Sequence, residues 1–339
     1  MSGGVDSTVA AMLALRSVAD CEGAVMQLRA DCGDGDDGVK DAKAAASRLG
    51  IPLSVYDFSD RFAELVIEAF IDAYRRGRTP NPCVDCNKHI KFGLLLEKAL
   101  EMGRDKIITG HYARIARGGD GRFLLKKGAD PDKDQSYVLY SLTQTQLARI
   151  VFPLGELSKK QVRGLALDAG FENAMSRESQ DICFVPDGDY AKFIEGYIRE
   201  KPQKGRFIGA DGVDLGENKG IIHYTVGQRR GLGLAMPHPV YVLEIRPDDN
   251  TVVIGRDDQL YSKTLTASQI NLIPVTRLDS PIRARVKLRY KQIEQPATIR
   301  QTGDDSLHIE FDEPQRAITK GQAAVIYDGE NVIGGGTIV

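Results

Sequence analysis

Residues 2–7 of this 339-residue chain read SGGVDS, the most informative stretch for the fold of its first part. It opens directly into an apolar sequence that predicts a helix over Val5–Ser17. Its two glycines let the backbone turn so that several N–H groups face one point, and the helix dipole adds positive potential there. Ser2 and Ser7 can add hydroxyl donors, and Asp6 is placed to hold a phosphate-bound Mg²⁺. A serine-capped helix after a glycine turn is the simpler interpretation, but SGGVDS as a unit favours a phosphate site.

Strand and helix signals alternate after this loop. Buried strands are predicted at Gly23–Leu28, Leu53–Phe58 and Lys106–Gly110. Further helices are predicted at Val39–Leu49, Phe62–Tyr74, Ile90–Met102, Thr143–Phe152 and Lys159–Ala169. Strands separated by helices imply a parallel sheet with both faces covered, which binds ligands beyond the carboxyl ends of its strands. The first part is therefore predicted to be an α/β, Rossmann-like domain.

The character of the chain changes after about residue 200. Glycine becomes frequent, and short β-branched runs recur at Val240–Ile245, Thr251–Ile254, Ile282–Leu288, Ala297–Ile299, Leu307–Phe311 and Ala323–Tyr327. Such spacing predicts two small, mainly β domains, the last of them barrel-like. Because the chain is too long for one ordinary core, we divide it into a catalytic domain at 1–198, a central β domain at 199–264 and a C-terminal barrel at 265–339.

Composition narrows the class of protein. Hydrophobic residues make up 42% and charged residues 27%, a globular balance. The net charge of −2 argues mildly against a nucleic-acid binder, but residues 260–300 carry eight Lys/Arg against Asp279 and Glu294, a local excess of six. No apolar run would span a membrane, and the start does not resemble a signal peptide, so we expect a cytoplasmic protein. In that reducing compartment structural disulfides are not expected among Cys21, Cys32, Cys83, Cys86 and Cys183.

Two segments present cysteines. In TPNPCVDCNKHIKF, residues 79–92, two prolines predict a rigid turn that displays Cys83 and Cys86 ahead of a helix from about Ile90. A thiol near a helix N-terminus and cations is expected to have a lowered pKa. CxxC alone could be half a zinc site, a redox pair or coincidence, but no second CxxC follows, and the position does not suit a thioredoxin-like site. Cys183 lies in SQDICF; its apolar neighbours suggest a buried filler, whereas the preceding polar stretch favours a loop.

The segment from Arg283 to Lys291 alternates with a period of two. Five cations fall on one face of the predicted strand, and Ala284, Val286, Leu288 and Tyr290 fall on the other. A solvated face is the simple interpretation. Five like charges in a row without acids repel each other, so we favour a surface that tracks phosphates.

Taken together, these motifs resemble the tRNA-specific 2-thiouridylase family over essentially the whole chain. The matching stretches are SGGVDSTVAAML (2–13), TPNPCVDCNKHIKF (79–92), TGHYARI (109–115), DKDQSYVLY (132–140), SRESQDICF (176–184), YTVGQRRGLG (224–233), LRYKQ (288–292) and GQAAVIY (321–327). The first resembles the pyrophosphate loop of ATP pyrophosphatases. The resemblance implies an enzyme that uses ATP, releasing AMP and diphosphate, to adenylate O2 of the wobble uridine, and then replaces that oxygen with sulfur carried on cysteine.

The family implies a role for each matching residue. Cys183 would carry the persulfide, and Cys86 would be the partner thiol, leaving a Cys86–Cys183 disulfide for reduction. ATP would bind, with Mg²⁺ on Asp6, at Ser2, Gly3, Gly4, Val5, Asp6, Ser7, Met26 and Gly110. The flipped target base and the rest of the tRNA would contact Asn81, Pro82, Cys83, His111, Lys133, Asp134, Gln135, Arg289, Tyr290 and Gln322. Partners would be tRNAs of the Lys, Glu and Gln type and a persulfide donor, such as a cysteine desulfurase or a sulfur relay protein.

Two departures from the family pattern keep alternatives open. Cys83 stands where many members carry aspartate, so Cys83, Cys86 and Cys183 could instead hold a [4Fe–4S] cluster with one open iron for sulfide. In the family the pyrophosphate loop follows a buried strand, yet here the loop begins at residue 2. The lack of that strand puts the affinity of this chain for ATP in doubt. The rival functions are another ATP pyrophosphatase, such as an amidating synthetase, and a catalytically inactive tRNA-binding protein with a metal-holding CxxC.

Overall fold

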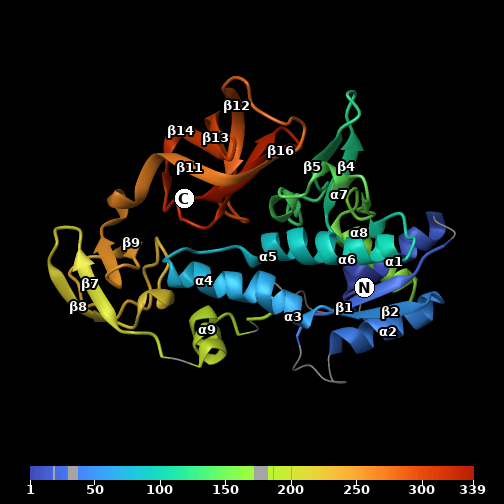
Figure 1. The fold of residues 1–339 in the computed structure, drawn as a ribbon, viewed down its shortest axis with the longest axis horizontal. Coiled ribbons are helices and arrows are strands. Elements are labelled where there is room, and N and C mark those ends of the chain that lie inside the picture. The colour runs from blue at the N-terminus through green and yellow to red at the C-terminus, as the bar shows by residue number, and fades with distance from the viewer. Residues whose placement is uncertain (18–19, 30–36, 172–181, 186, 200) are drawn as a thin grey trace.

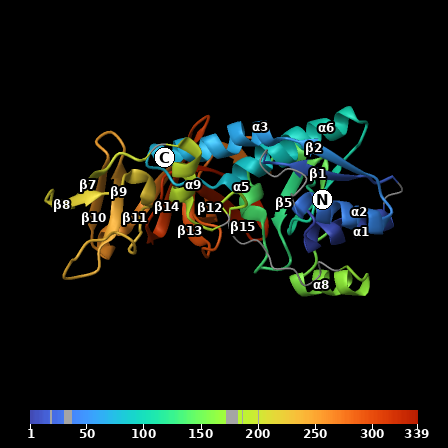
Figure 2. The same ribbon diagram turned by 90° about the horizontal axis from the view of Figure 1, so that it is seen from below.

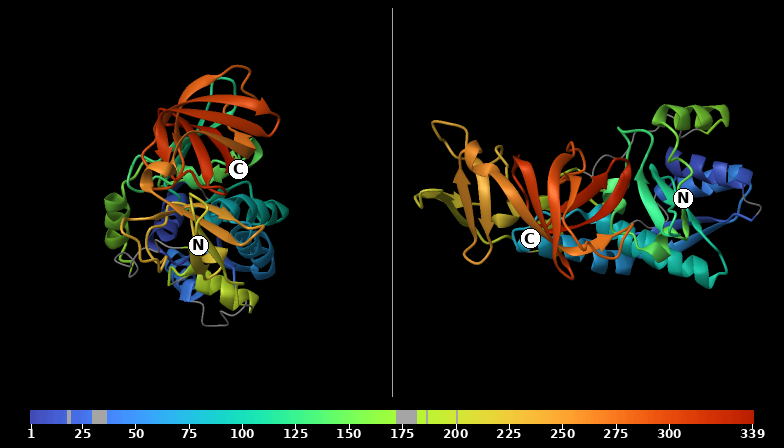
Figure 3. Two further views of the ribbon diagram at one scale, coloured as in Figure 1. Left: turned by 90° about the vertical axis from the view of Figure 1, so that its left-hand side faces the viewer. Right: turned by 90° about the horizontal axis from the view of Figure 1, so that it is seen from above.

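The computed structural model describes residues 1–339 except 18–19, 30–36, 172–181, 186 and 200. Its α/β part, with the N-terminus, lies at one end of the molecule, and a small β domain lies at the other (Figure 1). The C-terminal barrel lies between them, against long helices that run towards the small β domain. Figure 2, from below, and the right-hand view of Figure 3, from above, show the same order of parts, whereas the left-hand view of Figure 3 looks along the long axis of the molecule.

The α/β part confirms the predicted alternation of helices and parallel strands. Strand β1 (Gly23–Gln27) pairs in parallel with β2 (Leu53–Asp57), and β3 (Ile107–Ile108) pairs in parallel with β6 (Ile150–Val151). These are two separate two-stranded sheets. The helices around them include α1 (Val5–Ser17), α2 (Asp37–Leu49) and α8 (Lys159–Asp168). Apolar residues of α1 and α8, such as Val9 and Val162, share a buried cluster, which fixes the pyrophosphate-loop helix against α8.

The helix predicted over Thr143–Phe152 is shorter than expected. Helix α7 (Gln144–Leu147) begins with a capping box between Thr143 and Gln146 and ends after one turn. The β-branched pair Ile150 and Val151 then forms β6, because β3 offers it backbone partners and burial. Tertiary pairing therefore overrides the local helical pattern.

Two long helices form the middle of the molecule. One is continuous from α3 (Ser59–Phe62) through the π-helical η1 (Ala63–Glu68) to α4 (Ala69–Arg75). The other runs from α5 (Pro82–Asp85) through the π-helical η2 (Cys86–Leu94) to α6 (Leu95–Glu101). The wider π turns are frequent at functional sites, and Cys86 is the first residue of η2.

The second of these helices corrects the prediction of a turn before Ile90. Pro82 does not exclude a helix here, because it occupies the first helical position, where proline's missing N–H costs nothing. Asn81 is the N-cap, and its side-chain oxygen accepts a hydrogen bond from the backbone N–H of Cys83 at 3.2 Å. Cys83 and Cys86 therefore lie in the first turns of the helix rather than in a loop before it.

A short helix, α9 (Tyr190–Ile198), leads into the small β domain. Its four strands are β7 (Gly205–Gly209), β8 (Asp214–Asn218), β9 (Tyr241–Arg246) and β10 (Thr251–Gly255), in the order β8-β7-β10-β9. The single-turn helix η5 (Ile221–His223) follows β8. Phe207, Tyr224 and Val252 lie at the centre of its own core.

The C-terminal strands confirm the predicted barrel. They are β11 (Tyr261–Leu272), β12 (Ile282–Lys287), β13 (Gln295–Gly303), β14 (Ser306–Arg316), β15 (Ala323–Asp328) and β16 (Asn331–Ile338). Hydrogen bonding runs β11-β14-β13-β12-β15-β16 and returns from β16 to β11, which closes six strands. The long β11 serves both ends of this sequence: its first part pairs with β14 and its last part with β16.

A hairpin from the α/β part joins the barrel sheet. Strands β4 (Ala113–Arg117) and β5 (Phe123–Lys127) pair with each other, and β5 pairs with β16 through Asn331 opposite Lys126 and Val332 opposite Leu125. A buried cluster continues across this junction, from Phe92 of η2 to Tyr137 of the turn η3 (Ser136–Leu139) and Val325 of β15. The barrel is thus fixed to the helix that carries Cys83 and Cys86.

Candidate functional site

The pyrophosphate loop folds tightly against neighbouring segments. Gly3 has φ +78°, and a Cβ there would lie 2.4 Å from the Cβ of Asp41, so the turn requires glycine. The Ser7 hydroxyl accepts a hydrogen bond from the backbone N–H of Ser2 at 3.1 Å and donates to the carbonyl of Gly4 at 2.9 Å. These bonds hold the loop at the N-terminus of α1, where a helix binds anions.

Two other residues predicted to bind ATP differ in their place. A Cβ on Gly110 would lie 2.7 Å from the carbonyl carbon of Asp6, so Gly110 lies directly against the loop. Met26 lies in β1 and packs at the edge of the apolar cluster that includes Phe62 and Cys86. The amino group of Met1, directly before the loop, donates to the carbonyl of Ala24 in β1.

Asp6 is held by two side chains that sequence reasoning missed. The ammonium of Lys159 lies 2.7 Å and 2.8 Å from its two carboxylate oxygens, and the hydroxyl of Tyr112 donates to it at 2.7 Å. Lys159 is the first residue of α8, after its N-cap Ser158, and is 8% exposed. No local pattern in the sequence indicated the contact between Asp6 and Lys159, because these two residues are 153 positions apart.

The structure brings three cysteines together around the start of η2. Phe184 is almost fully buried, packs edge-on against Phe62 and Phe70, and belongs to the apolar cluster that contains Cys86. It thereby anchors the adjacent Cys183 near the helix. Cys83 and Cys183 are exposed, whereas Cys86 is buried. The thiols are close enough for the charge of Cys183 to raise the pKa values of both Cys83 and Cys86.

The expectation of a lowered thiol pKa at this helix is wrong. Burial raises the pKa of Cys86 to about 11. Loss of water around the sulfur atoms also raises the pKa values of Cys83 and Cys183, although part of the surface of each of these two residues is exposed. Lys91 is the leading influence in the opposite direction on all three thiols. Loss of water around the sulfur atoms therefore outweighs the effect of the nearby cation on these pKa values. Ser179–Asp181 and Cys32 lie outside the described residues.

Another ionisable group stands between the cysteines. Burial raises the pKa of Asp85 to about 6, although Lys88 counteracts part of this effect. Within the parts of the chain that are described, no three His, Cys, Asp or Glu side chains are grouped so that they could hold a metal ion.

Several predicted RNA contacts serve the fold in this ligand-free structure. The ring of His111 is buried between Phe92 and Phe152, bonds to the Thr109 hydroxyl at 2.8 Å, and has a pKa well below its usual range because of burial. Both oxygens of Asp134 accept hydrogen bonds, from the N–H groups of Gly128 and Ser136 and from the Ser136 hydroxyl.

Both neighbours of Asp134 are half-buried and have partners within the protein. The side-chain oxygen of Gln135 accepts a hydrogen bond from the N–H of Tyr112 at 3.0 Å. Lys133 also makes a further interaction within the protein. The described contacts of Asp134 and Gln135 therefore shape the segment beside the loop.

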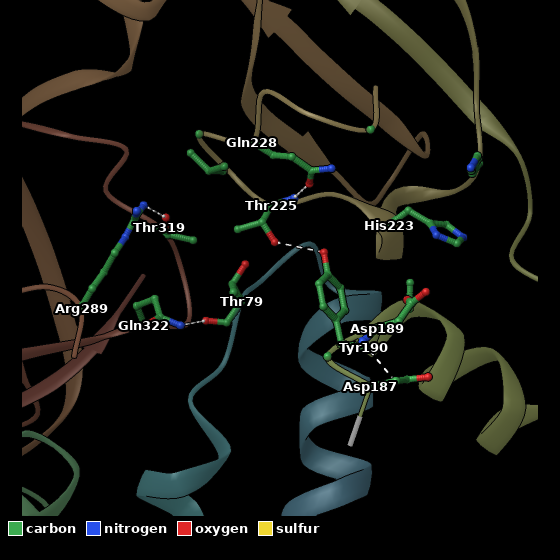
Figure 4. Close-up of a pocket in the computed structure, with 16 residues that line it drawn as sticks. Thr79, Asp187, Asp189, Tyr190, His223, Thr225, Gln228, Arg289, Thr319 and Gln322 are labelled. Carbon is green, nitrogen blue, oxygen red and sulfur yellow. Dashed lines mark hydrogen bonds between the residues drawn. The ribbon is translucent and has the colours of Figure 1, made fainter. Parts of the chain in front are cut away.

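Arg289 and Gln322 line one cavity of about 830 Å³ between four parts of the chain (Figure 4). Arg289 and Gln322 come from the barrel, Thr79 from the segment before the cysteines, Asp187–Ala191 from the start of α9, and residues between Lys219 and Gly231 from the small β domain. Arg289 donates to the carbonyl of Ala317 at 2.8 Å. The third predicted contact of this group, Tyr290, packs edge-on against the ring of Tyr137, with centroids 6.1 Å apart.

Gln322 connects the barrel to the cysteine segment. Its side-chain amide donates to the carbonyls of Thr79 and Pro80 at 2.7 Å and 3.3 Å. The backbone N–H of Thr79 in turn donates to the carbonyl of Lys320 at 2.8 Å. The barrel therefore holds the two residues that precede Asn81, the N-cap of the helix bearing Cys83 and Cys86.

Several cations of the segment from Arg283 to Lys291 have partners that the sequence pattern did not indicate. Arg283 makes a bidentate pair with Asp312 of β14, and Arg285 donates to the carbonyl of Glu294 at 2.8 Å. Lys287 is half-buried, with its ammonium over the rings of Tyr137 and Tyr290. The strand itself ends at Lys287, so Arg289 points into the cavity from the following turn. Acids from neighbouring segments relieve the repulsion that the sequence suggested.

Comparison with known proteins gives matches across the chain. Family models named tRNA methyl transferase HUP domain, tRNA methyl transferase PRC-barrel domain and Aminomethyltransferase beta-barrel domain match residues 1–187, 191–256 and 262–338. Proteins named tRNA-specific 2-thiouridylase MnmA from Clostridioides difficile, Acetivibrio thermocellus and Treponema denticola are 44%, 46% and 46% identical to it. Each alignment covers 100% of this chain and 96%, 97% and 96% of the relative. None of the described helices is long and apolar enough to cross a membrane.

Proposed function

Because this chain belongs to the tRNA-specific 2-thiouridylase family, we propose that it is a cytoplasmic enzyme that thiolates the wobble uridine of tRNA at the expense of ATP. Its substrates would be tRNAs of the Lys, Glu and Gln type. The sulfur would come from a persulfide donor, such as a cysteine desulfurase or a sulfur relay protein. Residues 1–198 would form the catalytic domain, 199–264 the central domain and 265–339 the tRNA-binding barrel.

The first step would be adenylation of the base. Oxygen O2 of uracil is a very poor leaving group, so O2 attacks the α-phosphorus of ATP, an O–P bond forms, and diphosphate leaves. The N–H groups of the loop and the α1 terminus would bind the phosphates, while Gly110 and Met26 would border the adenosine. Mg²⁺ usually takes one or two protein carboxylates together with substrate phosphates, and Asp6 at the loop fits that role. Bound there, Mg²⁺ would neutralise phosphate charge.

The second step would replace the activated oxygen with sulfur. The terminal sulfur of a Cys183 persulfide attacks C2 of the adenylated uracil, and AMP leaves with the oxygen. The Cys86 thiol then attacks the Cys183 sulfur, which breaks the S–S bond to the base and leaves 2-thiouridine and a Cys86–Cys183 disulfide. An external thiol reduces the disulfide. Asn81, Pro82 and Cys83 would border the flipped base at the start of α5, next to both thiols.

The observation that carries this proposal is the approach of Cys183 to Cys86. The two residues are far apart in the sequence, and Phe184 and Cys86 share one apolar cluster. An amidating ATP pyrophosphatase has no need of two adjacent thiols. We propose the persulfide route rather than an iron–sulfur cluster, since no three His, Cys, Asp or Glu side chains among the described residues are grouped so that they could hold a metal ion.

Thiolation and adenylation assays test the proposal. We expect unmodified tRNA to stimulate ATP/diphosphate exchange, and mass spectrometry of nucleosides to detect 2-thiouridine after addition of a persulfide donor. Cys86→Ser and Cys183→Ser should each abolish thiolation and retain the exchange. Cys21→Ser, which lies outside the apolar cluster that contains Cys86, should change neither. Exchange without tRNA but with a small acceptor would favour an amidating synthetase, and the absence of any exchange would favour an inactive tRNA-binding protein.

A further inference from the structure

Lys159 is a buried cation at the pyrophosphate loop to which the proposed mechanism gives no role. Its ammonium bonds both oxygens of Asp6, at 2.7 Å and 2.8 Å, and its side chain is 10% exposed. The backbone around it is fixed as well: the N–H of Lys159 donates to Asp130 at 2.8 Å, and Ser158 caps the helix. The ammonium is therefore held in a fixed position at the first turn of α1.

The pair is not sealed in the protein interior. The side chain of Asp6 is 33% exposed, so the ion pair reaches solvent on the side of the loop. Isolating a buried ammonium from water is costly, and a pair of this kind contributes little net stability compared with apolar residues of the same volume. A lysine whose charge reaches the mouth of an anion-binding loop is better explained by a ligand that carries negative charge.

A triphosphate changes the balance of charges at this pair. While both oxygens of Asp6 bond Lys159, the carboxylate is poorly placed to serve a metal ion. Phosphate oxygens that enter the loop would attract Lys159 and repel Asp6. The lysine side chain is flexible, so its ammonium can move by a few Å, on the order of its four-carbon stem, without movement of the backbone.

We propose that Lys159 is a phosphate-binding residue of this site, and that it exchanges Asp6 for the triphosphate when ATP binds. In the ligand-free protein the ammonium neutralises Asp6 and prevents an unpaired carboxylate from repelling the nucleotide. With ATP bound, the same ammonium contacts phosphate oxygens, and Asp6 becomes available to Mg²⁺ that arrives with the nucleotide. This inference rests on the proposed use of ATP by the loop.

Equilibrium binding of metal-free ATP and of adenosine, measured by calorimetry in the presence of a chelator, tests the exchange. The full chain is compared with Lys159→Met, Asp6→Asn and the double variant, and the exposed neighbour Lys160→Met is the control. Because no metal is present, the loss of Asp6 as a metal ligand cannot affect the comparison. We expect Lys159→Met to weaken ATP binding by about 10-fold to 100-fold, the range for one charge-assisted hydrogen bond. Adenosine binding and the Lys160→Met variant should change little.

The double variant distinguishes a phosphate-binding residue from a structural one. If Lys159 contacts phosphate, the double variant binds ATP about 10-fold or more weakly than Asp6→Asn alone. Equal ATP affinity of these two proteins would overturn the inference, since Lys159 would then act solely by neutralising Asp6. The comparison remains valid even if Lys159→Met alone misfolds, because the double variant contains no unpaired carboxylate at residue 6. Failure of the unaltered chain to bind ATP would instead contradict the proposed function.

Discussion

Cys86 should resist alkylation at neutral pH in the ligand-free protein. Burial raises the pKa of its thiol from 9.0 to about 11. At pH 7 this leaves about one thiol in ten thousand ionised, about 100-fold fewer than at a pKa of 9.0. Because the thiolate is the species that reacts, iodoacetamide should label Cys86 at least about 100-fold more slowly than an ordinary thiol. Its burial slows access further.

The assay is a time course of iodoacetamide labelling between pH 7 and pH 10, read by fragment-ion mass spectrometry that separates Cys83 from Cys86. The labelling rate of Cys86 should still be rising at pH 10, because a raised pKa delays ionisation. Lys91→Met should slow it further, since Lys91 favours the thiolate; Lys88→Met, which removes an exposed cation of the same helix, is the matched control. A labelling midpoint below pH 9 would refute this reasoning and restore the lowered pKa that the helix terminus suggested.

Three other predictions follow from the site. Arg289→Ala should weaken tRNA binding and lower the slope of log affinity against log salt concentration by about one unit. Arg283→Ala should have little effect, because Asp312 already pairs with Arg283. Equal effects of the two variants would contradict this difference in pairing. Gln322→Leu should lower the free energy of unfolding in urea by about 1–2 kcal/mol and reduce thiolation while ATP binding is retained, because the two carbonyls before Asn81 lose their donor. The control is Gln295→Leu, whose side chain bonds only to the carbonyl of Ile293, two residues away. Full thiolation by Gln322→Leu would contradict the positioning role. Iron-free protein should complete turnover with a persulfide donor, and activity confined to iron-loaded protein would replace the persulfide route by a cluster.

Features that depend on short stretches of sequence could be predicted. The glycine turn, the helix α1 after it, the parallel strands β1 and β2 and most barrel strands follow from local conformational preference and from hydrophobic period, and the family follows from motifs spread along the chain. The Pro82 error arose within the same local range: proline stops a helix in its interior but starts one at its first position, and the Asn81 cap decides between the two.

Burial and charge pairing were decided by the tertiary structure. The helix terminus beside Cys86 suggested a thiol with a lowered pKa, but aromatic residues from other parts of the sequence pack around it and remove the water that would solvate the thiolate. Arg283 seemed unpaired until β14 placed Asp312 beside it, and the partner of Asp6 lies 153 residues away, in α8. A residue's conformation is governed mainly by its nearest neighbours along the chain. Its electrostatic free energy depends on whatever the fold places within a few Å, because Coulomb interaction and desolvation act through space.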